Sequence, residues 1–383
     1  MGASFGCLAP RLVTGQFDAN YHHAVWPSTG NYCRGGAFNS RLLGAQGVAI
    51  LPAEMSQERF DWLHEIGAEV IATPGCESNV KEIFDKTNEL KQDPQYMIFN
   101  QFEEMGNPLW HYNVTGNALA DVYEAIKRPG DRFAGAAFTS GSAGTMSAGD
   151  LLKEKYPHLK LAVGEALQCP TILENGFGGH RIEGIGDKHI PWIHNVKNTD
   201  MVIDIDDEDS QRLLRLFNTP EGQAYLKNEL HLDDELIEKL TWLGISGIAN
   251  VLCCIKMAKY YEFTERDVVG TVLTDSAVMY GSRIQELNDQ YGAYNAHEAA
   301  MDHALHMLGL KLDNMQELTY ADRKRVHNLK YYTWVEQQGK TVEELNALWY
   351  DTEGTWDTVH AQAKDLDDLI NAFNEATGLL KDL

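Results

Sequence analysis

Short apolar segments alternate with amphipathic segments along most of this chain, and this alternation restricts the fold more than any other feature of the sequence. Apolar runs bounded by Gly, Pro or polar residues are typical of buried strands, whereas apolar residues spaced three and four apart indicate helices. Strands that alternate with helices predict an α/β fold, in which mostly parallel, twisted sheets are covered by helices on both faces. Strands are expected at 24–26, 47–51, 69–72, 96–99, 133–138, 159–163, 201–205 and 268–273.

The distribution of these segments also suggests a division of the chain. With 383 residues, the sequence is long enough for two subdomains. We expect a main domain over residues 1–290, with a small subdomain near residues 45–130. Beyond Arg283 the strand signals stop, so residues 291–383 are expected to form a helical extension. Its aromatic residues are expected to pack against the main domain or a second subunit: Tyr331, Tyr332, Trp334, Trp349 and Trp356.

The stretch from Phe133 to Tyr156 combines a predicted strand, a loop of small residues and an amphipathic helix. Small side chains let backbone N–H groups approach an anion, and the amino-terminal end of the helix adds its positive dipole end. The stretch has neither the GxxxxGK[ST] nor the GxGxxG pattern. A phosphate site is therefore predicted, with a simple tight turn as the alternative, in the loop Gly141-Ser142-Ala143-Gly144-Thr145.

Charge and cysteine content argue against several classes of partner and location. The formal net charge of −24 disfavours nucleic acids and anionic membranes as partners. No run reaches the roughly 18 apolar residues of a membrane span, and no signal peptide is expected. The six cysteines form no CxxC pair and no spaced framework, which favours a reducing, cytoplasmic location.

Several motifs together resemble one family, the fold-type-II pyridoxal-phosphate enzymes of the cysteine synthase and cystathionine β-synthase type, within the tryptophan synthase β-like superfamily. The loop at 141–145 resembles the family's Gly-Thr-Gly-Gly-Thr phosphate loop, with Ala143 in place of one glycine. The segment at 28–31 resembles the family's Thr-Ser-Gly-Asn loop. Further segments similar to family motifs follow in the same order, so that the resemblance covers roughly residues 1–283, at 100–108, 180–186, 244–247 and 273–276.

The resemblance implies pyridoxal 5′-phosphate as the cofactor and a role for each matching residue. Asn31 would contact the ring oxygen of the cofactor, Gly184 would line the ring, and Ser276 would lie at the pyridine nitrogen. A neutral hydroxyl at that nitrogen leaves it largely unprotonated and favours α,β-elimination over transamination. The phosphate would be held by Gly141, Ser142, Ala143, Gly144 and Thr145. The carboxylate of a small amino-acid substrate would be bound by Ser28, Thr29, Gly30 and Gln101.

The reaction implied by the resemblance is β-replacement or β-elimination on an amino acid with a leaving group at Cβ. Cysteine synthesis or breakdown is the first expectation. Ammonia-lyase or threonine-type chemistry is an alternative, because a fold does not fix the reaction. A non-catalytic cofactor-binding or partner protein is the alternative from another class. The family also leads us to expect a homodimer.

Two segments depart from the family pattern. The family's Schiff-base lysine lies in a Ser-x-Lys-x-Arg motif just before the first helix, and residues 1–4 resemble the opening of that helix. The lysine is therefore expected a few residues before Met1, no catalytic residue is assigned in this chain, and this chain alone would be inactive. A start placed too late, a second polypeptide and a non-catalytic relative are three open explanations. The second departure is Asp187-Lys188-His189, where Lys188 or His189 would reach the pocket or lie in a solvated loop.

The histidines of the extension do not lead us to expect a metal site. His297, His303 and His306 fall on one predicted helix, with Asp302 beside them. Zinc sites combine such ligands at short, regular spacings. No carboxylate and two histidines stand at a suitable spacing, so no residue is predicted to bind a metal ion.

Overall fold

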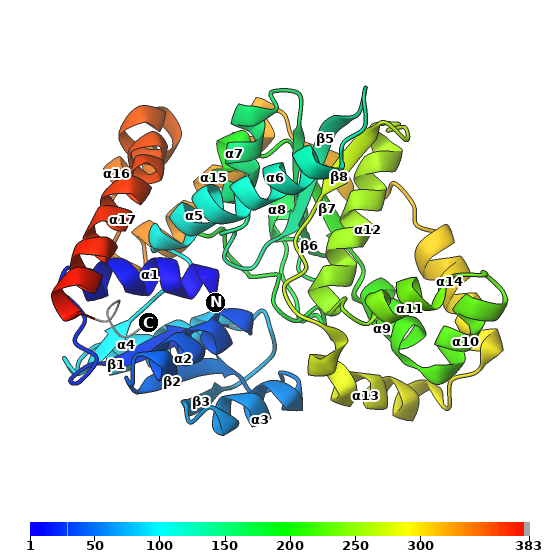
Figure 1. The fold of residues 1–383 in the computed structure, drawn as a ribbon, viewed down its shortest axis with the longest axis horizontal. Helices are drawn as coiled ribbons and strands as arrows, with labels where there is room; N and C mark the ends of the chain where they lie inside the picture. Colours follow the sequence, from blue (N-terminus) through cyan, green and yellow to red (C-terminus); the bar gives the residue numbers. More distant parts are fainter. Residues whose placement is uncertain (29, 379–383) are drawn as a thin grey trace.

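The computed structural model describes residues 1–28 and 30–378 and contains two β-sheets that lie side by side (Figure 1). The first sheet has the order β3-β2-β1-β4, with every pair parallel. Its strands are β1 (His23–Pro27), β2 (Gly47–Pro52), β3 (Glu69–Thr73) and β4 (Tyr96–Ile98). The helices around it are α1 (Gly2–Val13), α2 (Asn31–Leu42), α3 (Gln57–Glu65) and α4 (Val80–Leu90).

The second sheet has the order β8-β5-β6-β7-β9. Its strands are β5 (Arg132–Thr139), β6 (Lys160–Ala166), β7 (Met201–Ile205), β8 (Asp267–Gly270) and β9 (Met315–Glu317). Helical segments in this part include α5 (Gly106–Trp110), the π-helical turn η1 (His111–Gly116), α6 (Asn117–Ile126), α7 (Met146–Lys155), α8 (Thr171–Glu174) and the 3₁₀ turn η2 (Val196–Asn198). They continue with α9 (Asp207–Asn218), α10 (Pro220–Asn228), α11 (Asp234–Leu240) and α12 (Ile245–Tyr260).

Successive side chains of the strands contribute to different hydrophobic cores, because they point to opposite faces of a sheet. On β5, Ala136 packs in a core with helices α6 and α7, whereas the adjacent Ala137 packs in a core with α9 and α12. On β1, Trp26 packs with α1 and α2, whereas Val25 packs with α4. Helices therefore cover both faces of both sheets. The predicted α/β fold with mostly parallel sheets is confirmed.

The carboxyl-terminal part is mostly helical but is not purely so. Strand β9 pairs antiparallel with β7 at the edge of the second sheet. A strand of three residues is too short to show an alternating pattern, which is why the sequence did not reveal it. The remaining segments are η3 (Ala277–Tyr280), α13 (Gly281–Tyr291), α14 (Ala296–His303), η4 (Ala304–Leu308), α15 (Tyr320–Lys330), η5 (Tyr331–Val335), α16 (Val342–Tyr350), η6 (Glu353–Asp357) and α17 (Thr358–Thr377).

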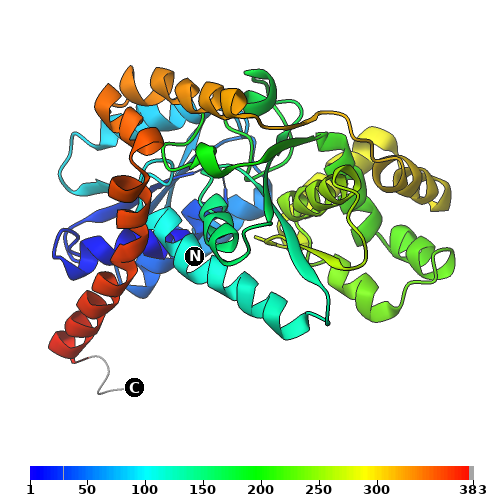
Figure 2. The same ribbon diagram turned by 90° about the horizontal axis from the view of Figure 1, so that it is seen from above.

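The carboxyl-terminal segments pack against elements that surround both sheets. Trp334 and Trp356 share a buried core with Phe84 of α4 and Trp192, and the Trp334 indole N–H donates to the carbonyl of Ile190 at 2.8 Å. Helix α17 runs beside α1 and α5 (Figure 2). The extension therefore connects the small sheet to the large one.

Among the described helices, none is by itself long and apolar enough to span a membrane. Helices α11 and α12 reach that length together, but they meet at an angle of 112°.

Candidate functional site

A cavity of about 350 Å³ lies between the two sheets, at the carboxyl ends of strands β1 and β5. Parallel α/β sheets bind ligands at this edge, and the volume is in the range of small-molecule pockets. The wall includes the start of α1, Ser28 after β1, the loop after β5 and residues of α5 and η1. Loops at 184–185 and 272–274 complete it. Segments that are distant in the sequence thus meet at one site.

The loop after β5 presents free backbone donors to this cavity. Within the described part of the chain, no N–H group of residues 141–145 donates a hydrogen bond to another residue. These residues precede α7, whose first N–H groups and dipole favour a negative charge. Ala143 has a φ of 63°, in the left-handed region, and this conformation turns the chain within the loop. The loop is therefore built to bind an anion through its backbone.

The helical wall from α5 and η1 fixes this loop in place. The Asn107 amide donates to the hydroxyl of Ser142 at 3.1 Å and to the carbonyl of Gln101 at 3.0 Å. A Cβ atom on Gly144 would lie 2.1 Å from the Oδ1 atom of Asn107, so the close contact requires glycine. His111 Nδ1 lies 2.9 Å from the Thr115 hydroxyl. Burial lowers the pKa of His111 to about 4, which keeps its imidazole neutral at neutral pH.

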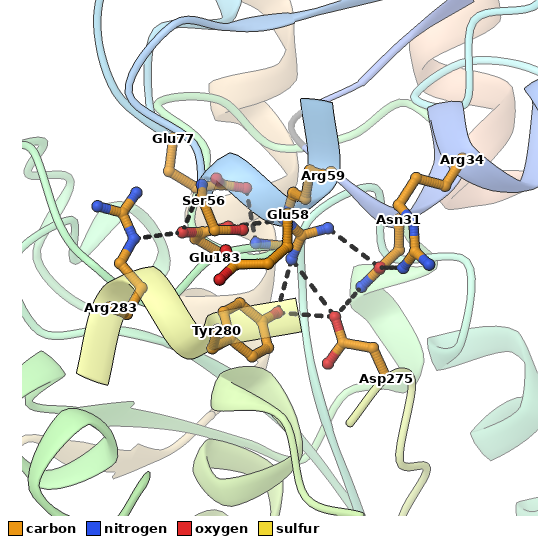
Figure 3. A network of polar contacts seen from close by, with 12 residues as sticks. Asn31, Arg34, Ser56, Glu58, Arg59, Glu77, Glu183, Asp275, Tyr280 and Arg283 are labelled. Atoms are coloured by element: carbon orange, nitrogen blue, oxygen red, sulfur yellow. Dashed lines mark hydrogen bonds and ion pairs between the residues drawn. The ribbon is translucent and has the colours of Figure 1, made fainter. Parts of the chain in front are cut away.

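On the other side of the cavity, Asn31 belongs to a buried polar network (Figure 3). The Asn31 Oδ1 atom accepts from Arg59 Nη1 at 3.1 Å, and its Nδ2 group donates to Asp275 Oδ2 at 2.9 Å. Arg59 is fully buried and forms an ion pair with Glu183 at 2.7 Å. Burial alone would raise the pKa of Glu183, but Arg59 and Arg283 outweigh it and lower that pKa. The network joins α2 and α3 to loops of the large subdomain.

Most of the residues predicted for the site line this one cavity. Ser276 does not line it; that position of the wall is formed by Thr274, while Asp275 turns toward Arg59. Thr29 lies outside the described residues. The predicted residues that line the cavity are Ser28, Gly30, Asn31, Gln101, Gly141, Ser142, Ala143, Gly144, Thr145 and Gly184.

Several lining residues were not assigned from the sequence: Trp110, His111, Thr115 and Asn250. Asn107, His111 and Thr115 recur at intervals of four, which places them on one side of a helical segment. That polar stripe is the signal that could have identified them. Asn250 connects β5 to the 272–274 loop, since it accepts from the N–H of Thr139 and donates to the carbonyl of Val272.

The segment before Ile190 does not reach the cavity. Lys188 Nζ lies 5.7 Å from the ring centroid of Phe177, and neither Lys188 nor His189 lines the wall. His189 is packed against the rings of Phe84 and Phe102 instead. Burial lowers the pKa of His189 to about 3. In residues 1–28 and 30–378, no group of three or more His, Cys, Asp or Glu is placed to hold a metal ion.

The donors at this site fit pyridoxal phosphate. Free N–H groups at a helix amino terminus suit a phosphate monoester. Gly144 packs closely against Asn107 and has no side chain, so no Cβ atom covers the backbone of the loop at this position. Asn31 lines the same cavity, and its amide would offer a donor to the ring oxygen. A hydroxyl from Ser276 is not available at the wall, so the contact with the ring nitrogen stays a prediction.

Comparison with known proteins identifies relatives of the whole architecture. The sequence profile of the "Pyridoxal-phosphate dependent enzyme" family matches residues 8–225. A cysteine synthase of Staphylococcus aureus is 32% identical over 257 residues, 67% of this chain and 74% of that protein. A hydrogen sulfide-producing enzyme of Fusobacterium nucleatum has the same fold, with a TM-score of 0.63 at 21% identity over 82% of this chain and 86% of that one. An O-acetylserine-dependent cystathionine beta-synthase of Helicobacter pylori gives 0.59 at 24% identity over 74% and 84%.

The matched region contains the 141–145 loop, the Asn31 loop, the whole first sheet and strands β5, β6 and β7 of the second sheet. These features and the shared sequence agree on one cofactor and one fold. The chain belongs to the pyridoxal-phosphate-dependent enzymes of fold type II, of the cysteine synthase and cystathionine β-synthase type.

Proposed function

We propose that this protein, with pyridoxal phosphate bound, carries out β-replacement or β-elimination on an amino acid that bears a leaving group at Cβ. The observation that carries the proposal is that the free N–H groups of residues 141–145 line the same cavity as Asn31, Ser28 and Gln101. A cofactor phosphate, a cofactor ring and a substrate carboxylate would then be held together. The relatives that make cysteine or produce hydrogen sulfide support this class of reaction.

In this mechanism, residues 141–145 hold the phosphate, Asn31 donates to the ring oxygen, and Gly184 leaves space for the ring. When bound, pyridoxal phosphate supplies an electron-withdrawing ring that stabilises negative charge at the substrate Cα. Ser28 accepts from the N–H of Gly30 at 2.8 Å and keeps its own proton to donate to the substrate carboxylate. Gln101 supports the same carboxylate.

The helical wall contributes uncharged side chains to the cavity. Trp110 and His111 line the cavity, with His111 beside Gly144 of the loop, and the neutral His111 adds no positive charge to the anion-binding groups. Excluding water strengthens each hydrogen bond from the loop to the phosphate. The phosphate is then held mainly by backbone donors.

A second candidate is cofactor binding without turnover by this chain alone. Within the described residues, no lysine lines the cavity. Lysine is the residue that forms a Schiff base with a carbonyl cofactor. The position of the Schiff-base lysine, the homodimer and the cytoplasmic location stay predictions.

Two measurements on the purified chain separate these candidates. Pyridoxal phosphate is titrated against the visible spectrum and the protein fluorescence, and the complex is then reduced with borohydride and weighed. Sulfide release from cysteine and cysteine formation from O-acetylserine and sulfide are assayed in parallel. Turnover supports the proposed function. Saturable binding without turnover, and without a lysine-linked adduct, would instead support the second candidate.

Gly144→Ala tests whether the loop is the cofactor site. The added methyl group would lie 2.1 Å from the Asn107 Oδ1 atom and must displace the loop, so cofactor affinity should fall by at least about tenfold. Gly247→Ala is the matched control, since its nearest neighbour would be at an ordinary 3.5 Å. Equal affinities of both variants for pyridoxal phosphate would contradict the assignment.

A further inference from the structure

The burial of the Arg59 side chain is unexpected for a charged residue on a surface helix. It lies on α3, yet its side chain is fully buried. Its guanidinium donates to Asn31 at 3.1 Å, to Glu183 at 2.7 Å and to the Tyr280 hydroxyl at 2.6 Å, as Figure 3 shows. It also lies 3.4 Å from the Asp275 carboxylate. Arg59 does not line the cavity itself, but Asn31 does.

The hydrogen bonds of Asn31 allow one orientation of its carboxamide. Two guanidinium groups, those of Arg59 at 3.1 Å and Arg34 at 3.4 Å, are donors and require the oxygen. The Asp275 carboxylate at 2.9 Å is an acceptor and requires the NH₂ group. If the amide were flipped, its NH₂ group would face the two guanidinium donors and its oxygen would face the Asp275 carboxylate, so these hydrogen bonds would be lost.

This orientation leaves one amide proton of Asn31 for a ligand. The NH₂ group has two protons and Asp275 takes one. The Nδ2 atom lies 3.6 Å from the position of a Cβ on Gly184, another lining residue, so the group stands at the cavity wall. Asn31 consequently offers a donor to the cavity, which an acceptor oxygen such as that of the cofactor ring can use.

We propose that Arg59 is a positioning residue that fixes the Asn31 carboxamide with its N–H toward the cavity and thereby strengthens the hydrogen bond to the cofactor's ring oxygen. This inference rests on the proposed function, because it specifies how the site binds its cofactor. Arginine suits the role because one planar fork reaches Asn31, Glu183 and Tyr280 at once. A lysine has a single nitrogen and cannot keep that geometry.

A double-mutant cycle with Arg59→Met and Asn31→Ala tests the inference. Arg59→Met should weaken pyridoxal phosphate binding roughly 3- to 10-fold, the range of one neutral hydrogen bond. The same change in the Asn31→Ala background should have almost no effect, because the group that it orients is gone. Affinity is read from fluorescence quenching, and the cofactor's absorption maximum should shift only when Asn31 is present.

Arg283→Met is the matched control. Arg283 also pairs with Glu183, at 2.7 Å, but among the described residues it makes no hydrogen bond or ion pair with Asn31. Its loss should therefore leave cofactor affinity within about twofold of the wild-type value. A loss as large as that of Arg59→Met would show that the ion pairs of Glu183 matter rather than the orientation of Asn31, and would overturn the proposal.

If Arg59→Met does not fold, Tyr280→Phe replaces it in the cycle. The change removes a hydroxyl that accepts from Arg59 and donates to Asp275 at 2.7 Å, while the ring remains. It should weaken binding about twofold to threefold in the wild-type background only. Additive effects with Asn31→Ala would overturn the proposal. Normal cofactor binding without turnover would contradict the proposed function alone, and no binding by the wild-type chain would overturn both.

Discussion

The loop proposed to bind the phosphate contains an alanine in a conformation that suits glycine. Ala143 has a φ of 63°, and its side chain is almost completely buried. A non-glycine residue in the left-handed region costs about 1–2 kcal/mol. The family has a glycine in the matching loop. This chain therefore keeps the backbone geometry of the loop but has a less stable way of forming it.

We expect Ala143→Gly to stabilise the fold by about 0.5–1 kcal/mol, since the relief of strain exceeds the added chain entropy of glycine. Cofactor affinity should change less than threefold, because the N–H groups stay in place. Urea unfolding measures the first effect. Ala148→Gly, inside α7, is the control and should destabilise by about 1 kcal/mol. Equal losses in both variants would refute the strain argument.

At the scale of elements, the extension is joined to the small subdomain by one aromatic core. Trp334 is fully buried beside Phe84, Phe102 and Trp192, and its N–H is bonded to the Ile190 carbonyl. The neighbouring Tyr332 is 63% exposed. The two rings lie on the same short segment, η5, but only one of them connects two parts of the molecule.

Trp334→Ala should destabilise the protein by about 3–5 kcal/mol, because it opens a cavity and leaves a carbonyl without its donor. Tyr332→Ala should stay within about 0.5 kcal/mol of the wild type. Chemical denaturation gives both values. Similar losses in the two variants would mean that the segment stabilises the fold through its helix and not through the aromatic core.

At the scale of the whole molecule, buried ionisable groups set the dependence of stability on pH. Burial raises the pKa of Asp187 to about 8 and that of Asp150 to about 7. A carboxyl group whose pKa is raised on folding contributes fully to the stability of the folded state below its pKa in the unfolded chain, which is near 4. This contribution is lost as the pH rises through the pKa of the group in the folded protein. Burial lowers the pKa of His111 and His360 to about 4. Their contribution is present above about pH 6.5 and is lost toward pH 4.

Above about pH 7.5 these histidines are neutral in both states, so the free energy of unfolding should fall as pH rises toward 8. Asp187 has a simple environment, since both carboxylate oxygens are buried without a hydrogen-bond partner among the described residues. Asp187→Asn should flatten the slope by up to about 1 kcal/mol per pH unit and stabilise the protein at pH 8. Urea unfolding at several pH values measures this. A slope equal to that of the wild type would contradict the raised pKa.

Local sequence patterns predicted the strands, the helices and the short binding motifs, because these features depend on neighbouring residues. The alternation of strands and helices predicted every strand of the two sheets except β9, and short motifs marked ten of the residues that line the cavity. The sequence did not single out Arg59, because its burial depends on Glu183 and Tyr280, more than a hundred positions away. Ser276 matched a motif, but the path of the 272–275 loop decides which side chain reaches the wall. That path is set by contacts such as Asp275 with Asn31.

The contact of α17 with α1 and α5 has a consequence for biosynthesis. Helix α1 opens one wall of the cavity and α5 supplies Asn107 and Trp110, so the helix beginning at Thr358 supports residues made hundreds of codons earlier. Chains fold as they leave the ribosome, at about 5–20 residues per second. The two sheets can form during translation, but the wall of the cavity is braced only after residues 358–377 have emerged.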